Sequence, residues 1–159
     1  MKKIKFAAIL LLAFLPLPAL ALTPMEYFNS LVAGATTTGY EDGSFYEAEF
    51  DQPTALALDA SGDRLFVADS NNNRIRVVFL NEQNRVETFA GNGKALCADG
   101  PLMEASFNHP SQLAILPDDR LAVCENGDSR VRMIDLKTKT VSTVGKGGYG
   151  LVWSMVYEL

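Results

Sequence analysis

Few residues in this chain could carry out acid–base or metal chemistry. His109 is the one histidine, and so the one side chain that ordinarily titrates near neutral pH. Gln52 occupies the same position in an earlier copy of the surrounding sequence, and no nucleophile motif of the G-x-S-x-G type accompanies the histidine. A polar loop residue is the simpler interpretation of His109. We therefore expect no catalytic residue in this chain.

The segment from Asp69 to Asn73 is the strongest candidate for a calcium ligand set. Its side-chain oxygens fall at positions one, three and five, as they do at the start of an EF-hand loop. Position six is Arg74 instead of glycine, and position twelve is Leu80 instead of glutamate. A polar hairpin turn explains the segment better. Zinc generally needs three or four nitrogen or sulfur ligands, which one histidine and two cysteines supply poorly. We expect no metal site and no cofactor.

The two cysteines, Cys97 and Cys124, form no C-x-x-C redox motif. They could form a disulfide if the chain is exported to an oxidising compartment. Neither recurs in the other copy of the repeat, and spacing alone cannot show that the two Cβ atoms meet.

The elements that must position these residues come from a stretch that occurs twice, at 42–78 and 99–134. Over the first part the copies align at an offset of 57, with 8 of 17 positions identical. The offset then falls to 56 and 55, and each lost residue lies in a polar connection. Because turns absorb deletions more readily than strands, the copies are interpreted as homologous structural units.

Each copy contains four short apolar runs separated by glycine, aspartate, asparagine and serine. In the first copy they are Thr54–Asp59, Arg64–Asp69, Arg74–Leu80 and Arg85–Ala90. Their length, composition and short turns predict four antiparallel strands per copy, which is a β-propeller blade. The middle runs do not alternate in polarity, as expected for a sheet that is buried on both faces. The sequence therefore predicts an all-β propeller fold with about two blades.

These motifs resemble the NHL-repeat family. The first copy reads DGSFYEAEFDQPTALAL, RLFVADSNNNRIRVV and RVETFAG, and the second reads DGPLMEASFNHPSQLAI, RLAVCENGDSRVRMI and TVSTVG. The chain departs from the family pattern at Ala55 and Gln112, where glycine is usual, and at Glu125, where aspartate is usual. The resemblance implies a six-bladed, TolB-like propeller, but it does not imply one activity.

One Arg-x-Arg pair follows the same turn in each copy, and the pairs are Arg74/Arg76 and Arg130/Arg132. We expect Arg74 to pair with Asp69 across the turn, and Arg130 with Glu125, because Glu125 takes the position of Asp69 in the second copy. We interpret these residues as structural; anion binding is the alternative.

Two aromatic and two proline residues are expected to have structural roles as well. Phe50 and Phe107 should fill the space between blades. Pro53 and Pro110 should set the start of the inner strand.

The N-terminal segment predicts export. Lys2, Lys3 and Lys5 precede an apolar core, and Ala19-x-Ala21 fits a signal-peptidase site, so we expect cleavage after Ala21 and a periplasmic or secreted protein with no stable membrane anchor. An uncleaved anchor is the alternative. The expected divisions are 1–21 signal peptide, 22–34 lead-in and outer closing strand, 35–90 first blade, 91–145 second blade, and 146–159 the start of a third repeat and a divergent apolar tail.

The charge of the chain argues against a nucleic-acid partner. The formal charge is −5, and it becomes −8 without the three lysines of the signal peptide. We expect a non-catalytic scaffold that binds an unidentified protein or glycan through its loops. The alternative is a fragment of a metal-dependent, lactonase-like hydrolase or lyase whose site lies on other blades.

The repeat pattern also stops abruptly. Thr143–Gly145 and Gly148-Tyr149 begin a third copy, but no Asp-Gly follows. We expect a truncated propeller, and a complete short protein with its own cap is the alternative. If this chain is the complete gene product, copies could assemble into a homo-oligomer, since isolated repeats bury their faces only against neighbours.

Overall fold

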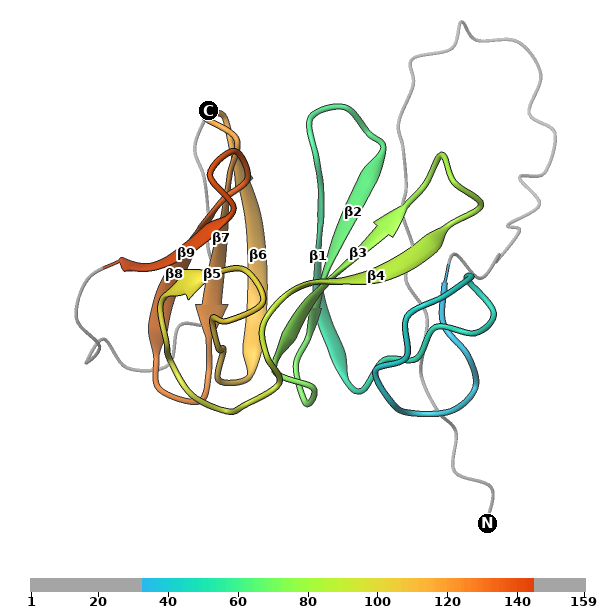
Figure 1. The fold of residues 1–159 in the computed structure, drawn as a ribbon, viewed down its shortest axis with the longest axis horizontal. Helices are drawn as coiled ribbons and strands as arrows, with labels where there is room; N and C mark the ends of the chain where they lie inside the picture. Colours follow the sequence, from blue (N-terminus) through green and yellow to red (C-terminus); the bar gives the residue numbers. More distant parts are fainter. Residues whose placement is uncertain (1–32, 145–159) are drawn as a thin grey trace, which may run out of the picture.

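The computed structural model describes residues 33–144. The expected signal peptide (1–21), nearly all of the lead-in (22–34) and the divergent tail (146–159) lie outside the described residues. In the described part, every regular element is a β-strand, and the strands form two antiparallel sheets (Figure 1). No helical segment there has the length and apolar character needed to cross a bilayer.

The first sheet, called blade 1, is a four-stranded meander in the order β1-β2-β3-β4. Its strands are β1 (Pro53–Leu58), β2 (Arg64–Asp69), β3 (Arg74–Phe79) and β4 (Arg85–Ala90). The β2–β3 turn closes through Asn73, which has a φ of 53°, a left-handed conformation that asparagine tolerates better than most residues.

The second sheet, called blade 2, repeats this meander and adds one short strand at the outer edge. Its order is β5-β9-β8-β7-β6. The strands are β5 (Gly100–Pro101), β6 (Pro110–Leu116), β7 (Arg120–Glu125), β8 (Arg130–Asp135) and β9 (Thr140–Val144). The prediction of all-β propeller blades, each a meander of four antiparallel strands, is confirmed.

The main core lies between the two blades, which stand side by side with β1 packed against β6 (Figure 1). Phe66 and Ile75 of blade 1 meet Leu121 and Ile134 of blade 2, with Phe107 fully buried among them. A second apolar cluster covers the other face of blade 1. Because β2 contributes side chains to both clusters, it has no polar face, and this explains its lack of alternation.

The connections that lead into the blades also protect their outer edges. Residues 35–49, called the first connection, pass along β4, where Gly43 exchanges two backbone hydrogen bonds with Val86. Residues 91–106, called the second connection, place Gly100 opposite Val141 in the same way. The outer strand of each blade therefore has a partner over part of its free edge.

Two polar contacts join the blades beside the core. The Thr54 hydroxyl donates to the carbonyl of Pro110 at 3.1 Å, and the amide of His109 donates to Asn73 Oδ1 at 3.0 Å. Pro53 and Pro110 each begin an inner strand, and a register irregularity follows each of them.

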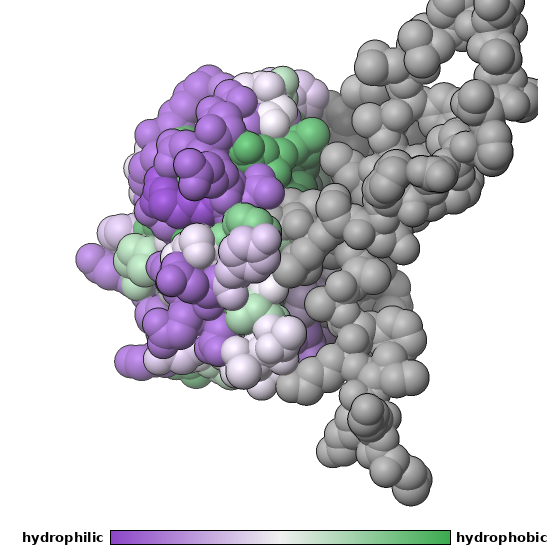
Figure 2. All heavy atoms as spheres, turned by 90° about the vertical axis from the view of Figure 1, so that its right-hand side faces the viewer, coloured by the Kyte–Doolittle hydropathy of each residue, from purple (hydrophilic) through white to green (hydrophobic). Residues whose placement is uncertain are grey.

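Figure 2 shows the side of the molecule that carries β4. Hydrophilic residues cover most of the described surface that is visible there, with only small hydrophobic patches between them. This exposed hydrophilic surface agrees with the charged turn between β3 and β4, where Glu82 and Arg85 form an ion pair.

Candidate functional site

A buried arginine ties the first connection to blade 1. Arg76 is fully buried and sits over the ring of Phe50, with 5.1 Å from Cζ to the ring centroid. Its two terminal nitrogens donate hydrogen bonds to four acceptors: Asp69 Oδ2 at 3.0 Å, Asp42 Oδ1 at 2.6 Å, the carbonyl of Glu49 at 2.8 Å and the carbonyl of Glu41 at 2.9 Å. We call this arrangement of Arg76 and its four acceptors the Arg76 latch.

The same latch recurs in blade 2 around Arg132, which is also fully buried and sits over Phe107. Its acceptors are Glu125 Oε1 at 3.2 Å, Asp99 Oδ1 at 2.7 Å, the carbonyl of Ser106 at 2.8 Å and the carbonyl of Ala98 at 2.9 Å. Each of these four acceptors is the repeat equivalent of an acceptor of Arg76, and Arg132 also donates to Cys97 Sγ at 3.3 Å.

The expected ion pairs of Arg74 with Asp69 and of Arg130 with Glu125 were wrong. Asp69 does lie opposite Arg74 in the strand register, but its carboxylate pairs with Arg76, one position deeper in the sheet on the same face. Burial raises the pKa of Asp69, although hydrogen bonds from Asn72, the amide of Asp51 and Arg76 oppose that shift. In the same way, burial raises the pKa of Glu125.

The possible disulfide is not formed, since Cys97 and Cys124 are both free thiols. Cys97 lies on the second connection and donates a hydrogen bond to Glu125 Oε2, with 3.1 Å from sulfur to oxygen. Because successive side chains of a strand point to opposite faces, Cys124 points away from the face that carries Glu125 and Cys97.

Cys97, Glu125 and Asp128 form the one group of potential metal ligands found among residues 33–144, with ligand atoms within 4.8 Å of one another. Burial raises the pKa of Cys97 to about 12, so a metal ion would have to displace the thiol proton before it could bind the sulfur. Arg132 and Arg130 already neutralise the two carboxylates, at 3.2 Å from Glu125 and 3.3 Å from Asp128. The charge balance favours ion pairs over a bound cation.

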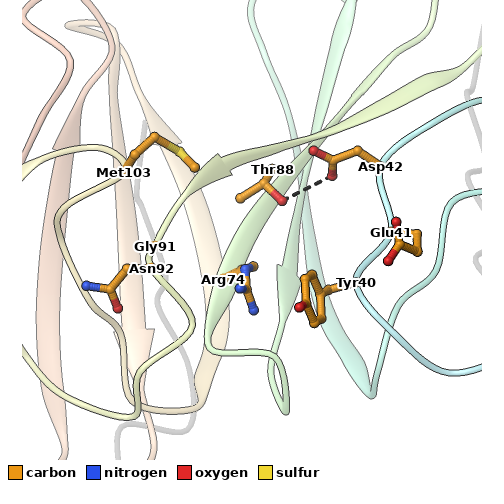
Figure 3. A pocket seen from close by; sticks show the side chains of 8 residues that line it. All are labelled: Tyr40, Glu41, Asp42, Arg74, Thr88, Gly91, Asn92 and Met103. Carbon is orange, nitrogen blue, oxygen red and sulfur yellow. Dashed lines mark hydrogen bonds between the residues drawn. The ribbon is translucent and has the colours of Figure 1, made fainter.

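A pocket of about 400 Å³ opens at the β2–β3 turn end of blade 1, between the first and second connections. It is lined by Tyr40, Glu41, Asp42, Arg74, Thr88, Gly91, Asn92 and Met103 (Figure 3). Asp42 accepts hydrogen bonds from Thr88 at 3.1 Å and from Arg76 at 2.6 Å, and these contacts hold that part of the wall. Tyr40 and Met103 are 54% and 55% exposed.

Arg74 stands at the centre of this pocket in Figure 3. Its guanidinium carbon lies 4.2 Å from the centroid of the Tyr40 ring. On the other side it touches the backbone at Gly93, where a Cβ atom would lie 2.6 Å from both terminal nitrogens. One terminal nitrogen donates to the carbonyl of Asn72 at 2.9 Å. The side chain is held in place without a carboxylate partner.

The repeat equivalent in blade 2 is built differently. Arg130 corresponds to Arg74, and Asp128 corresponds to Asn72. Asp128 supplies the carboxylate that Arg74 lacks, at 3.3 Å from Arg130 Nε. Cys97 stands where blade 1 has Tyr40. In blade 1 this position therefore holds an arginine without a carboxylate partner, whereas in blade 2 Asp128 neutralises the corresponding arginine.

Sequence reasoning did not find the pocket. It treated Arg74 as one half of an ion pair and did not consider Tyr40 as its neighbour. A signal was present, because Tyr40 and Cys97 fall at the same repeat position, 57 residues apart, just as Arg74 and Arg130 do at 56. Among the other expected site residues, His109 is exposed and hydrogen-bonds only to nearby asparagines in the described structure.

Two meandering sheets that pack face to face, with connections running from the outer strand of one to the inner strand of the next, define a β-propeller protein. Residues 50–78 match the family model of the NHL repeat. NHL repeat-containing protein 2 of Gallus gallus is 33% identical over 106 residues, which cover 65% of this chain and 14% of that protein. Protein SUPPRESSOR OF QUENCHING 1, chloroplastic, of Arabidopsis thaliana is 48% identical over 56 residues, covering 35% of this chain and 5% of that protein.

Among solved structures, a protein of unknown function from Bacteroides thetaiotaomicron superposes with a TM-score of 0.60 at 26% identity, covering 64% of this chain and 26% of the other. The matched part of this chain thus spans about a quarter or less of each of these relatives. The chain carries an NHL repeat at residues 50–78 and resembles NHL repeat-containing proteins, as its sequence motifs indicated.

Proposed function

We propose that this chain is a non-catalytic, exported NHL-propeller module that binds a protein or glycan through the pocket around Arg74. The observation that carries the proposal is the lining of that pocket. It combines an exposed aromatic ring, Tyr40, with charged and amide groups from Arg74, Glu41 and Asn92. Its volume of about 400 Å³ falls within the range of small-ligand pockets, and convergent polar groups are what fix the orientation of a polar ligand.

The frame around the pocket supports a binding role, because contacts within the chain already hold some of its side chains. The Arg76 latch fixes Asp42, and the backbone at Gly93 supports one face of the Arg74 guanidinium. A preorganised site loses less conformational entropy on binding than a mobile one does. The NHL fold is compatible with this role without requiring it, since a fold does not determine activity.

A panel of immobilised glycans and peptides, probed with the purified chain, tests the proposal. We expect retention on a subset of the panel, lost in Tyr40→Ala and retained in Tyr46→Ala. Tyr46 is the matched control, because its ring is 70% exposed but lies outside the pocket lining. Equal retention of the two variants would show that the pocket is not the binding site.

The non-catalytic part of the proposal needs its own assay. The chain and a longer homologue are incubated with lactone substrates and added divalent metal, then with a chelator. Turnover that the chelator abolishes would contradict this part of the proposal. The export part is tested by mass spectrometry of the N-terminus after expression in a bacterium, where we expect a protein that begins at Leu22.

A further inference from the structure

We infer that the pocket recognises its ligand through a carboxylate bound to Arg74, and that the ligand is an acidic sugar of the uronic-acid class. This inference rests on the proposed binding function and narrows it to one ligand chemistry.

The first observation is that Arg74 lacks a carboxylate partner. Within residues 33–144 the other arginines each form at least one ion pair with aspartate or glutamate, and these are Arg64, Arg76, Arg85, Arg120, Arg130 and Arg132. Arg74 instead makes its hydrogen bond to a neutral carbonyl, that of Asn72. No carboxylate of the described residues therefore lies within ion-pair distance of its guanidinium.

The second observation is the orientation of the guanidinium. The group lies between the Tyr40 ring and the backbone of Gly93, and its hydrogen bond to Asn72 fixes one edge. A guanidinium has five N–H donors in a planar fork, so donors remain for a ligand in the same plane. A guanidinium binds most strongly to a carboxylate that accepts two parallel hydrogen bonds from it.

The third observation comes from blade 2, where the corresponding position is occupied. There Asp128 replaces Asn72 and places its carboxylate 3.3 Å from Arg130 Nε. The chain thus shows in one blade the chemical group that complements this arginine, and omits that group in the other. A ligand carboxylate beside Arg74 would take the role that Asp128 takes beside Arg130.

The rest of the lining favours a sugar over a bare anion. Glu41 has no ion pair within the described structure, so its charge opposes an anion that brings no hydrogen-bond donor, such as sulfate, whereas the hydroxyl groups of an acidic sugar can offset that repulsion by donating to it. A carboxylate can instead accept hydrogen bonds from hydroxyl groups, and the Asn92 amide can donate and accept. The exposed Tyr40 ring and the Met103 side chain offer apolar contact to the C–H face of a sugar ring.

The test compares D-glucuronate with its methyl ester, which keeps the hydroxyl groups and removes the charge. Binding to the 159-residue chain is followed by NMR through the arginine Nε–Hε signals. We expect a saturable shift of the Arg74 signal and at least tenfold tighter binding of glucuronate than of the ester, which is about 1.4 kcal/mol. Arg74→Gln should lose at least tenfold in affinity, and Arg74→Lys should lose affinity while keeping the charge. The matched control, Arg130→Gln, should bind within about twofold of the unmodified chain, because Asp128 already neutralises Arg130.

Each other outcome overturns a defined part of the inference. Equal binding of acid and ester, with no loss in Arg74→Gln, would refute the carboxylate while leaving a sugar-binding module. Equal or tighter binding of N-acetyl-alanyl-alanine, which has a free carboxylate and no sugar hydroxyls, would refute the sugar class. No saturable response to glucuronate up to its solubility would refute the inference as a whole, and the glycan and peptide panel would still decide the proposed function separately.

Discussion

Replacing Arg76 with leucine should destabilise the fold far more than replacing an exposed arginine of the same blade. The substitution removes donors from four acceptors and leaves the fully buried Asp69 carboxylate without its cation. Asp69 would keep only the amide of Asp51 and the Asn72 side chain as donors. Breaking a buried ion pair from one side costs about 3–5 kcal/mol. That is a large part of the roughly 5–15 kcal/mol that stabilises a typical domain.

The matched control is Arg85→Leu. Arg85 pairs with Glu82 and Glu87 on the surface, where its side chain is 41% exposed. An exposed ion pair contributes about 0–1 kcal/mol because water and salt screen it. Urea unfolding followed by circular dichroism gives the free energy of unfolding for both variants. We expect Arg76→Leu to unfold at much lower urea, or not to fold, and Arg85→Leu to resemble the unmodified chain.

The double variant Asp69→Leu with Arg76→Leu tests whether the loss of stability comes from the uncompensated Asp69 carboxylate or from the other hydrogen bonds of Arg76. If the cost comes from the uncompensated carboxylate, removing the carboxylate as well should restore part of the stability. A loss below about 1 kcal/mol in Arg76→Leu, similar to that of Arg85→Leu, would refute the argument that the latch is buried and coupled.

Three further predictions concern acid, the core and the thiols. Burial acts to raise the pKa of Asp99, but hydrogen bonds from Thr143 and Arg132 lower it on balance. The unmodified protein should therefore have a higher free energy of unfolding than Asp99→Asn above about pH 4. This difference should disappear as pH falls through the lower folded-state pKa of Asp99, and urea midpoints measured across pH would show it. Phe107→Ala should cost about 3–5 kcal/mol in urea unfolding, since Phe107 is fully buried between the blades; a loss under 1 kcal/mol would contradict that packing. Because the pKa of Cys97 is raised to about 12, iodoacetamide at pH 8 should modify it slowly in folded protein and rapidly in urea, as mass spectrometry would detect; fast labelling of the folded form would contradict the burial.

The strands were predictable from the sequence because two kinds of local signal agreed. Apolar runs of strand length alternate with turn residues, and the pattern occurs twice, so an error in one copy would conflict with the other. The four expected runs of the first copy match β1 to β4 to within one residue at each end. Loss of alternation in Leu65–Ala68 correctly indicated burial on both faces of β2.

The partners of the arginines were not predictable in the same way. Register correctly placed Asp69 opposite Arg74, but the side chains that donate to its carboxylate are those of Asn72 and Arg76. Arg76 forms the ion pair because the first connection brings the carbonyls of Glu41 and Glu49 within its reach. Those contacts join residues separated by 35 and 27 positions, and no local pattern encodes them. The pocket around Arg74 depends on the same long-range path of the chain.

The pairing of Gly43 with Val86 has a consequence for how a blade folds. The two residues are 43 positions apart, so the outer edge of blade 1 is completed by a segment synthesised before β1. Closing such a long loop costs entropy that only the finished sheet offsets, which makes the contact a late and cooperative step. The smallest piece able to fold as blade 1 therefore begins near Asp42, upstream of the first strand. A boundary drawn at Pro53 for expression would leave β4 with a bare edge and would remove three of the four acceptors of Arg76.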